Sequence, residues 1–145
     1  VRGMTVEAGW SLPDGQTTTF EEAHGISFEP TGGADGSWRA WFDVGDRDRQ
    51  MMGIVHGGMY AALAETVASV GTLAAVVDEG FICMGQANAT NFLRPATEGR
   101  VEALAVPLHR GRTTWVWDVE MTSDGKRVAR STVTIAVRPR PGTPA

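Results

Sequence analysis

Cysteine is nearly absent from this chain, which has one, Cys83, among 145 residues. A single cysteine cannot form an intramolecular disulfide or supply the usual cysteine ligands of zinc, and it fits a reducing compartment. Because Cys83 falls on a predicted strand of small residues, we expect a buried structural thiol. The chain has three histidines, and their spacing is not that of metal ligands: His24, His56 and His109. The sequence therefore predicts neither a metal site nor a bound cofactor.

Several catalytic and targeting motifs are also missing. The chain has no GxSxG nucleophile elbow and no Gly-rich phosphate loop of the GxGxxG or Walker type, which disfavours a serine hydrolase and those phosphate sites. Its first residues do not combine a basic segment with an apolar segment, as a signal peptide does, and Glu65 interrupts its longest apolar stretch. We therefore expect neither a signal peptide nor a membrane span, and a cytoplasmic protein.

Charge is unevenly divided along the chain, whose net value is −4. Residues 1–90 carry four basic and twelve acidic side chains, whereas residues 91–145 carry nine and five. The net negative charge disfavours general nucleic-acid binding. The C-terminal part has arginines that either bind phosphates through charge-assisted hydrogen bonds or form a solvated surface: Arg94, Arg110, Arg112, Arg138 and Arg140.

Hydrophobic periodicity predicts one domain of class α+β. A short helix is expected over residues 17–24, where Thr19 and Glu22 have the spacing of a capping box. One long helix is expected over residues 57–77, and after Gly80 the apolar period changes to two. Strands are expected over residues 25–30, 37–44, 82–93, 101–109, 113–122 and 127–137. This order predicts an antiparallel sheet wrapped around one long central helix, between a loose segment at 1–17 and a disordered tail at 139–145.

The long helix is the most informative segment. It is apolar almost all round, which predicts that it forms the core of the domain. Glu65 stands in its middle, and because burying an ionised carboxylate is costly, we expect a functional role for it. The plain alternative is a partly exposed or salt-bridged helix residue. Ser69 lies four residues further on and shares the face of Glu65.

The start of this helix offers a site for negative charge. His56, Gly57 and Gly58 stand where free backbone N–H groups and the positive end of the helix dipole favour an oxyanion. The glycines could equally serve a tight helix entry. Gln50, just before the helix, can add a side-chain amide. An acid and an oxyanion site together indicate acyl transfer, in which Glu65 attacks the acyl carbon or activates water.

Helix geometry predicts that the site is shared between subunits. Gly57 and Glu65 are eight residues apart, which is about 12 Å along a helix axis. A reacting carbonyl must lie within about 3 Å of both groups, and the backward lean of the glutamate side chain closes only part of the gap. We therefore expect Gly57 of one subunit to act with Glu65 of another across a two-fold interface, so that the site requires a homodimer.

Four segments resemble the hotdog-fold acyl-CoA thioesterases, especially the branch of the Arthrobacter-type 4-hydroxybenzoyl-CoA thioesterase. They are GIVHGGMYAALAET, GQANATNFLRPATEG, HRGRTTWVWDV and STVTIAVRPR. The resemblance covers roughly residues 18–140, and the HGG-to-Glu spacing makes it fairly specific. It implies a single hotdog domain over residues 18–138, assembled as a dimer of dimers, hence a homotetramer.

The resemblance also implies roles for individual residues. Glu65 matches the catalytic nucleophile or base, and the Gly57 N–H matches the group that polarises the thioester carbonyl. Gln50 matches a polar group beside that carbonyl, and Ser69 stands at the position of a threonine that helps to position water. The segments that bind acyl-CoA contain His56, Gly58, Val70, Arg94, Arg112, Thr113, Thr114, Arg138 and Arg140.

Val70 bears on the choice of substrate. It follows Ser69 where the 4-hydroxybenzoyl enzyme has a carboxylate that contacts the ring hydroxyl, and an apolar site discriminates only weakly for a hydroxyl. We therefore expect hydrolysis of 4-hydroxybenzoyl-CoA or a related aryl- or arylacetyl-CoA to the free acid and CoA, with CoA as part of the substrate. The alternatives are a non-catalytic acyl-CoA-binding hotdog module and a hydroxyacyl-thioester dehydratase that uses His56.

Overall fold

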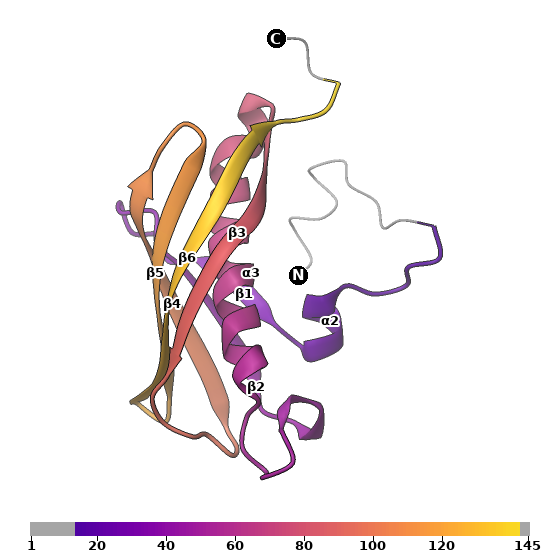
Figure 1. Ribbon diagram of the computed structural model, residues 1–145, viewed down its shortest axis with the longest axis vertical. Coiled ribbons are helices and arrows are strands. Elements are labelled where there is room, and N and C mark those ends of the chain that lie inside the picture. The colour runs from indigo at the N-terminus through magenta and orange to yellow at the C-terminus, as the bar shows by residue number, and fades with distance from the viewer. Residues whose placement is uncertain (1–13, 143–145) are drawn as a thin grey trace.

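The computed structural model describes residues 14–142. One long helix lies along one face of a six-stranded antiparallel sheet (Figure 1), whose strand order is β1-β2-β4-β5-β6-β3. The helices are α2 (Phe20–His24) and α3 (Gly57–Val76), with 3-10 turns η1 (Asp46–Asp48) and η2 (Val77–Glu79). The strands are β1 (Ser27–Pro30), β2 (Trp38–Asp43), β3 (Phe81–Phe92), β4 (Arg100–Arg110), β5 (Thr114–Ser123) and β6 (Lys126–Pro139). This is the predicted hotdog arrangement, a sheet wrapped around one central helix.

The core forms where α3 packs on the sheet. Leu63 and Val67 of α3 are fully buried with Phe42 of β2 and Trp117 of β5. A buried indole N–H needs a partner, and Trp117 Nε1–H donates to Thr72 Oγ1 of α3 over 2.9 Å. The side chains of Trp115 and Trp117 stack with ring centroids 6.1 Å apart, so the two tryptophans are core packing.

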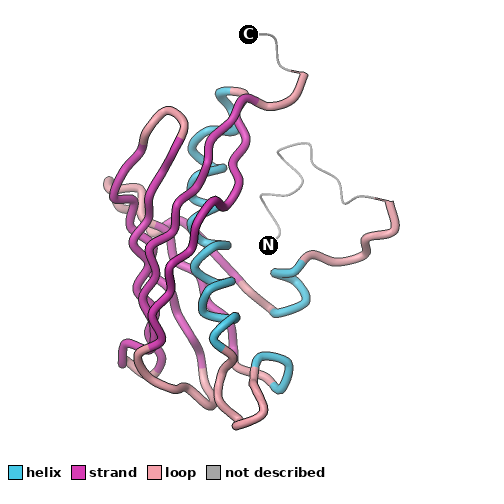
Figure 2. The backbone as a smooth tube through the Cα atoms, viewed as in Figure 1, coloured by secondary structure: helices cyan, strands magenta, loops and turns pink. Residues whose placement is uncertain are grey.

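Strand β3 forms one edge of the sheet and lies next to α3, as the tube in Figure 2 also shows. It pairs with β6 along one side, and that ladder is interrupted by a register shift between Gly85 and Ala87. The strand is largely exposed, including Met84 at 52% and Phe92 at 59%. An open strand edge with exposed apolar side chains is a template for pairing with another chain.

Most predicted elements are confirmed within one to three residues. The capping box of α2 is present, because Glu22 N–H donates to Thr19 Oγ1 and Thr19 N–H to Glu22 Oε2. The prediction that α3 forms the core of the domain is confirmed by the full burial of Leu63 and Val67. Glu65 and Ala74 are exposed on the flanks of the helix. Residues 1–13 and 143–145, which include most of the expected loose segment and part of the expected tail, lie outside the described residues. The loose segment, the disordered tail and the domain limits at 18 and 138 stay predictions.

Helix α3 with η2, Gly57–Glu79, is long and apolar enough to cross a membrane by length and composition. Half of the most apolar window is buried inside the domain, as in the core helix of a globular fold. The composition of this helix therefore leaves the expected absence of a membrane span a prediction. The apolar character of α3 is explained by its packing on its own sheet.

Candidate active site

Helix α3 begins with a free backbone donor. The N-cap residue His56 accepts a hydrogen bond from Gly58 N–H at Nδ1 over 2.9 Å, and its carbonyl accepts from Met59 N–H. Among the hydrogen bonds of residues 14–142, the Gly57 N–H has no protein acceptor. A free N–H at the positive end of a helix is suited to an oxyanion. His56 and Gly58 have a capping role in the structure, and their contact with substrate stays a prediction.

A cleft of about 410 Å³ opens at this helix start. Its walls are mostly apolar and are formed by Gln50, Ile54, Val55, Gly57, Tyr60, Phe92, Leu93, Arg94 and Pro95. The Phe92 ring lies against Gly57, where an added Cβ would stand 3.0 Å from Phe92 Cζ. The rings of Tyr60 and Phe92 are 6.2 Å apart and tilted. Sequence reasoning missed both aromatic residues, because their meeting depends on where β3 ends relative to α3.

Gln50 lines this cleft and is held in place by a tight turn. Its backbone N–H donates to Ile54 carbonyl over 2.9 Å, and its carbonyl accepts from Gly53 N–H, whose φ of 79° suits glycine. The side-chain Oε1 accepts from Met52 N–H. Because only the oxygen of an amide can accept this bond, the NH₂ group of Gln50 is left as a donor.

Glu65 lies away from this cleft, on the flank of α3 that faces β3. It is exposed in the single chain, so the cost of burial does not apply to it, and none of the ion pairs between described residues includes it. Its carboxylate lies over Gly85, where an added Cβ would stand 2.6 Å from Glu65 Oε1. On the same flank, Cys83 Sγ donates to the Ser69 carbonyl over 3.3 Å. Ser69 and Val70 are half-buried.

The candidate residues thus form two separate groups in one chain. Gln50 and Gly57 share the cleft at the start of α3, and Glu65 with Ser69 lies two turns further along the helix. This separation agrees with the spacing in the sequence. Neither group alone has both an acid and a carbonyl-binding donor.

Comparison with known proteins identifies the family. Residues 52–130, more than half of the chain, match the family model of the thioesterase superfamily. The chain belongs to the thioesterase superfamily. It is a thioester hydrolase with a hotdog fold, and hotdog thioesterases act on acyl-CoA substrates.

Three relatives are informative. The 1,4-dihydroxy-2-naphthoyl-CoA hydrolase of Escherichia coli is 33% identical over 137 residues, which cover 94% of this chain and 96% of that protein. The structure of thioesterase PA1618 from Pseudomonas aeruginosa, solved as a glutamine-to-alanine variant, superposes with a TM-score of 0.77 at 36% identity, covering 82% of this chain and 85% of that one.

The third relative is the thioesterase SAV0944 of Staphylococcus aureus. Its glutamate-to-alanine variant superposes with a TM-score of 0.77 at 31% identity, covering 83% of this chain and 99% of that one. Its glutamine-to-alanine variant gives 0.75 at 30% identity, covering 82% and 98%. In SAV0944 the replaced glutamate lies fifteen positions after the replaced glutamine.

The phosphate-binding candidates of this thioesterase lie at both ends of α3. Arg94 borders the cleft beside Gly57. At the opposite end, Arg138 Nη1 donates to the Thr113 carbonyl over 3.0 Å. Arg112 and Thr113 lie in the turn between β4 and β5, and Thr114 is the first residue of β5. Arg112 lines a cavity of about 250 Å³ with Arg110 and Glu79. Arg140 N–H donates to the Gly80 carbonyl near the end of α3. One chain therefore does not gather these groups at one place.

Other reactive groups are engaged in packing. Burial raises the pKa of the Cys83 thiol to about 11, which disfavours the thiolate that a nucleophile needs. Burial also raises the pKa of Tyr60, which is 3% exposed, with a smaller opposing effect from the Ala96 backbone. Within residues 14–142, no group of three or more His, Cys, Asp or Glu side chains is placed to hold a metal ion.

Proposed function

We propose that this thioesterase hydrolyses an aromatic acyl-CoA in a site shared by two subunits. The observation that carries the proposal is the placement of two groups along one open strand edge. Glu65 lies over Gly85 in the first half of β3, whereas Gly57 lies against Phe92 at the end of the same strand. Each chain thus offers an acid at one place along the edge and a carbonyl-binding donor at another.

A two-fold axis through the middle of β3 would complete the site. Antiparallel pairing reverses the strand direction, so the Phe92 end of one subunit would lie beside the Gly85 half of the other. Glu65 of one subunit would then face Gly57 and Gln50 of its partner, and two equivalent sites would form. The exposed edge of β3 supports this pairing, because an isolated chain leaves its backbone groups unpaired. We extend the proposal to a homotetramer, in line with the resemblance stated above.

The proposed chemistry assigns one task to each residue. The Gly57 N–H and the Gln50 NH₂ group donate to the thioester oxygen and stabilise the negative charge that develops on it. Glu65 either takes a proton from water, which then attacks the carbonyl carbon, or attacks that carbon itself to form an anhydride that water cleaves. The C–S bond breaks and CoA leaves as a thiolate. Ser69, one helical turn from Glu65, would hold the water.

The spacing of functional residues supports these assignments. Gln50 and Glu65 are separated by fifteen positions, the same interval as the glutamine and glutamate replaced in SAV0944. A glutamine and a glutamate at this interval are therefore found in a relative of the same fold. We propose that Arg94, Arg112, Thr113, Thr114, Arg138 and Arg140, supplied by more than one subunit, bind the nucleotide and phosphates of CoA.

The character of the cleft supports an aromatic acyl group. Its walls are mostly apolar, and the tilted rings of Tyr60 and Phe92 suit a planar ring. The relative from E. coli is named for an aromatic acyl-CoA. Val70 beside Ser69 offers no partner for a ring hydroxyl. We therefore propose 4-hydroxybenzoyl-CoA or a related aryl- or arylacetyl-CoA as substrate, in a cytoplasmic enzyme that needs no cofactor.

Release of free thiol from a panel of thioesters tests the proposal. Turnover should be fastest with 4-hydroxybenzoyl-, benzoyl- or phenylacetyl-CoA and slower with medium-chain acyl-CoA. Glu65→Gln should lower kcat by at least a hundred-fold in a protein with unchanged circular dichroism. Wild-type turnover in this variant would contradict the role of Glu65. Tight binding of every CoA ester without thiol release would indicate a binding module, and loss of water from a hydroxyacyl thioester would indicate a dehydratase.

A further inference from the structure

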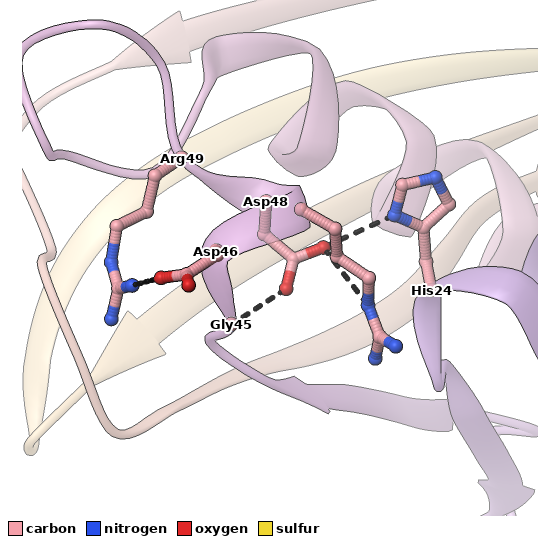
Figure 3. A network of polar contacts seen from close by, with 6 residues as sticks. His24, Gly45, Asp46, Asp48 and Arg49 are labelled. Atoms are coloured by element: carbon pink, nitrogen blue, oxygen red, sulfur yellow. Dashed lines mark hydrogen bonds and ion pairs between the residues drawn. The ribbon is translucent and has the colours of Figure 1, made fainter.

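A fully buried carboxylate lies just before the turn that carries Gln50. Asp48, the last residue of η1, is 0% exposed, although the loop around it is on the surface. Its Oδ2 accepts from Gly45 N–H over 2.9 Å, and its Oδ1 accepts from His24 Nδ1–H over 3.1 Å (Figure 3). Arg47 Nε lies 3.7 Å from the same Oδ1. A buried charge is tolerated only with such partners, and losing one of them is costly.

The main chain of Asp48 reaches the start of α3. Its carbonyl accepts from His56 N–H over 2.8 Å. Arg49, which follows Asp48, forms a β-bridge with Val55, which precedes His56. The segment between these two contacts is the tight turn that carries Gln50. Asp48 therefore joins three parts of the chain: the end of α2 through His24, the beginning of the loop through Gly45, and the N-cap of α3 through His56.

We infer that Asp48 is a positioning residue, which with His24 fixes Gln50 and Gly57 relative to one another. This inference rests on the proposed function of those two donors. Gln50 follows Asp48 by two residues, and Gly57 follows the His56 that Asp48 binds. Two donors that must converge on one thioester oxygen need a fixed separation, because a displacement of about 1 Å at a reacting group can reduce the rate about a hundred-fold.

The chain offers a matched control in the same 3-10 turn. Asp46 is fully exposed and pairs with Arg49 through Nη1 over 2.6 Å, and it is absent from the contacts of His24 and His56. Asp48→Ala and Asp46→Ala therefore remove the same chemical group from the same turn. Only the first removes the side-chain contacts with His24 and Gly45.

Steady-state kinetics with benzoyl-CoA distinguish positioning from stability. Asp48→Ala should lower kcat ten- to a hundred-fold at a temperature where it is folded, with KM changed less than three-fold, since the cleft and the arginines remain. Asp46→Ala should keep kcat within two-fold. A wild-type kcat for folded Asp48→Ala would overturn the inference, whatever its thermal stability.

Asp48→Asn tests the same positioning role, and it also serves if Asp48→Ala does not fold. Its side chain can still accept from Gly45 N–H, whereas a neutral amide replaces the carboxylate at His24 Nδ1. If these hydrogen bonds position the loop, Asp48→Asn should lower kcat less than Asp48→Ala does, with KM again changed less than three-fold. A kcat for folded Asp48→Asn no higher than that of Asp48→Ala would contradict a role for these hydrogen bonds.

Hydrogen exchange separates this inference from the proposed function. The His56 amide, which bonds to the Asp48 carbonyl, should exchange at least ten-fold faster in Asp48→Ala, and measurably faster in Asp48→Asn, than in Asp46→Ala. If wild-type protein hydrolyses no thioester while this difference is found, the proposed function fails and the support of the loop by Asp48 stands. Equal exchange rates would overturn the inference even in an active enzyme.

Discussion

The carboxylate of Glu65 lies so close to Gly85 that a Cβ at this glycine would stand 2.6 Å from Glu65 Oε1 and 3.0 Å from its Cδ. The contact joins the middle of α3 to the edge strand β3, next to the point where the β3 and β6 ladder shifts register. A glycine at this point leaves room for the carboxylate beside β3. The backbone of β3 therefore limits the positions that the Glu65 carboxylate can adopt.

We expect Gly85→Ala to lower activity without much loss of stability. The atom that the new methyl group meets is the end of a flexible side chain, so Glu65 can move aside with little effect on folding. The displaced carboxylate would no longer reach the acyl carbon, and kcat should fall at least ten-fold. Assays of thiol release with urea unfolding of the same variant measure both effects.

A double-mutant cycle provides the control for this variant. If Gly85→Ala acts through Glu65, it should have almost no further effect on kcat in a Glu65→Gln background, because coupled residues are not additive. Equal fold losses in both backgrounds would show that the methyl group acts through something other than the acid.

The sequence was sufficient to predict the helices and strands, but not which side chains on the flanks of α3 and in the loops are exposed or buried. The change of period from 3.6 to two locates α3 and the strands, because local alternation reports which side chains face a core. The exposure of Glu65 depends on β3 being an edge strand beside β6, and strand order is set by long-range packing that no local pattern encodes. Asp48 is buried by contact with His24, 24 positions away, in a loop without periodicity. Its neighbours in the sequence therefore gave no signal of its burial.

Cys83 should react slowly with alkylating agents in the folded protein. Burial raises the pKa of its thiol to about 11, so the thiolate is scarce at pH 8. Labelling by iodoacetamide, followed by mass spectrometry, should accelerate steeply as the pH rises toward 11. The raised pKa means that the folded protein favours the protonated thiol. The contribution of Cys83 to the free energy of unfolding is therefore complete below the pKa of an unfolded thiol and is lost as the pH rises through about 11. Labelling of folded protein at pH 8 as fast as in urea would contradict this.

Thr72→Val should destabilise the core by leaving a donor unpaired. Thr72 Oγ1 accepts from Trp117 Nε1–H over 2.9 Å and donates to the Ala68 carbonyl over 2.8 Å. Valine has the same shape but no hydroxyl, so the buried indole N–H loses its partner at a cost of about 1–3 kcal/mol. Urea denaturation measures the change. Thr72→Ser keeps the hydroxyl and should retain the hydrogen bond, and the exposed Thr132→Val should change the unfolding free energy by less than about 0.5 kcal/mol.

Subunit complementation tests whether the active site is shared. Gln50→Ala and Glu65→Gln should each be inactive alone. In a hybrid dimer, one site combines both altered residues, and the other combines the intact Gln50 of one subunit with the intact Glu65 of its partner. Random pairing of co-expressed variants yields about half hybrid dimers, each with one intact site, so specific activity should recover to about a quarter of wild type. If both groups acted within one chain, every site would contain one altered residue and no activity would return. That result would contradict the proposed interface. The roles of Gln50 and Glu65 would still be judged from the activity of each variant alone.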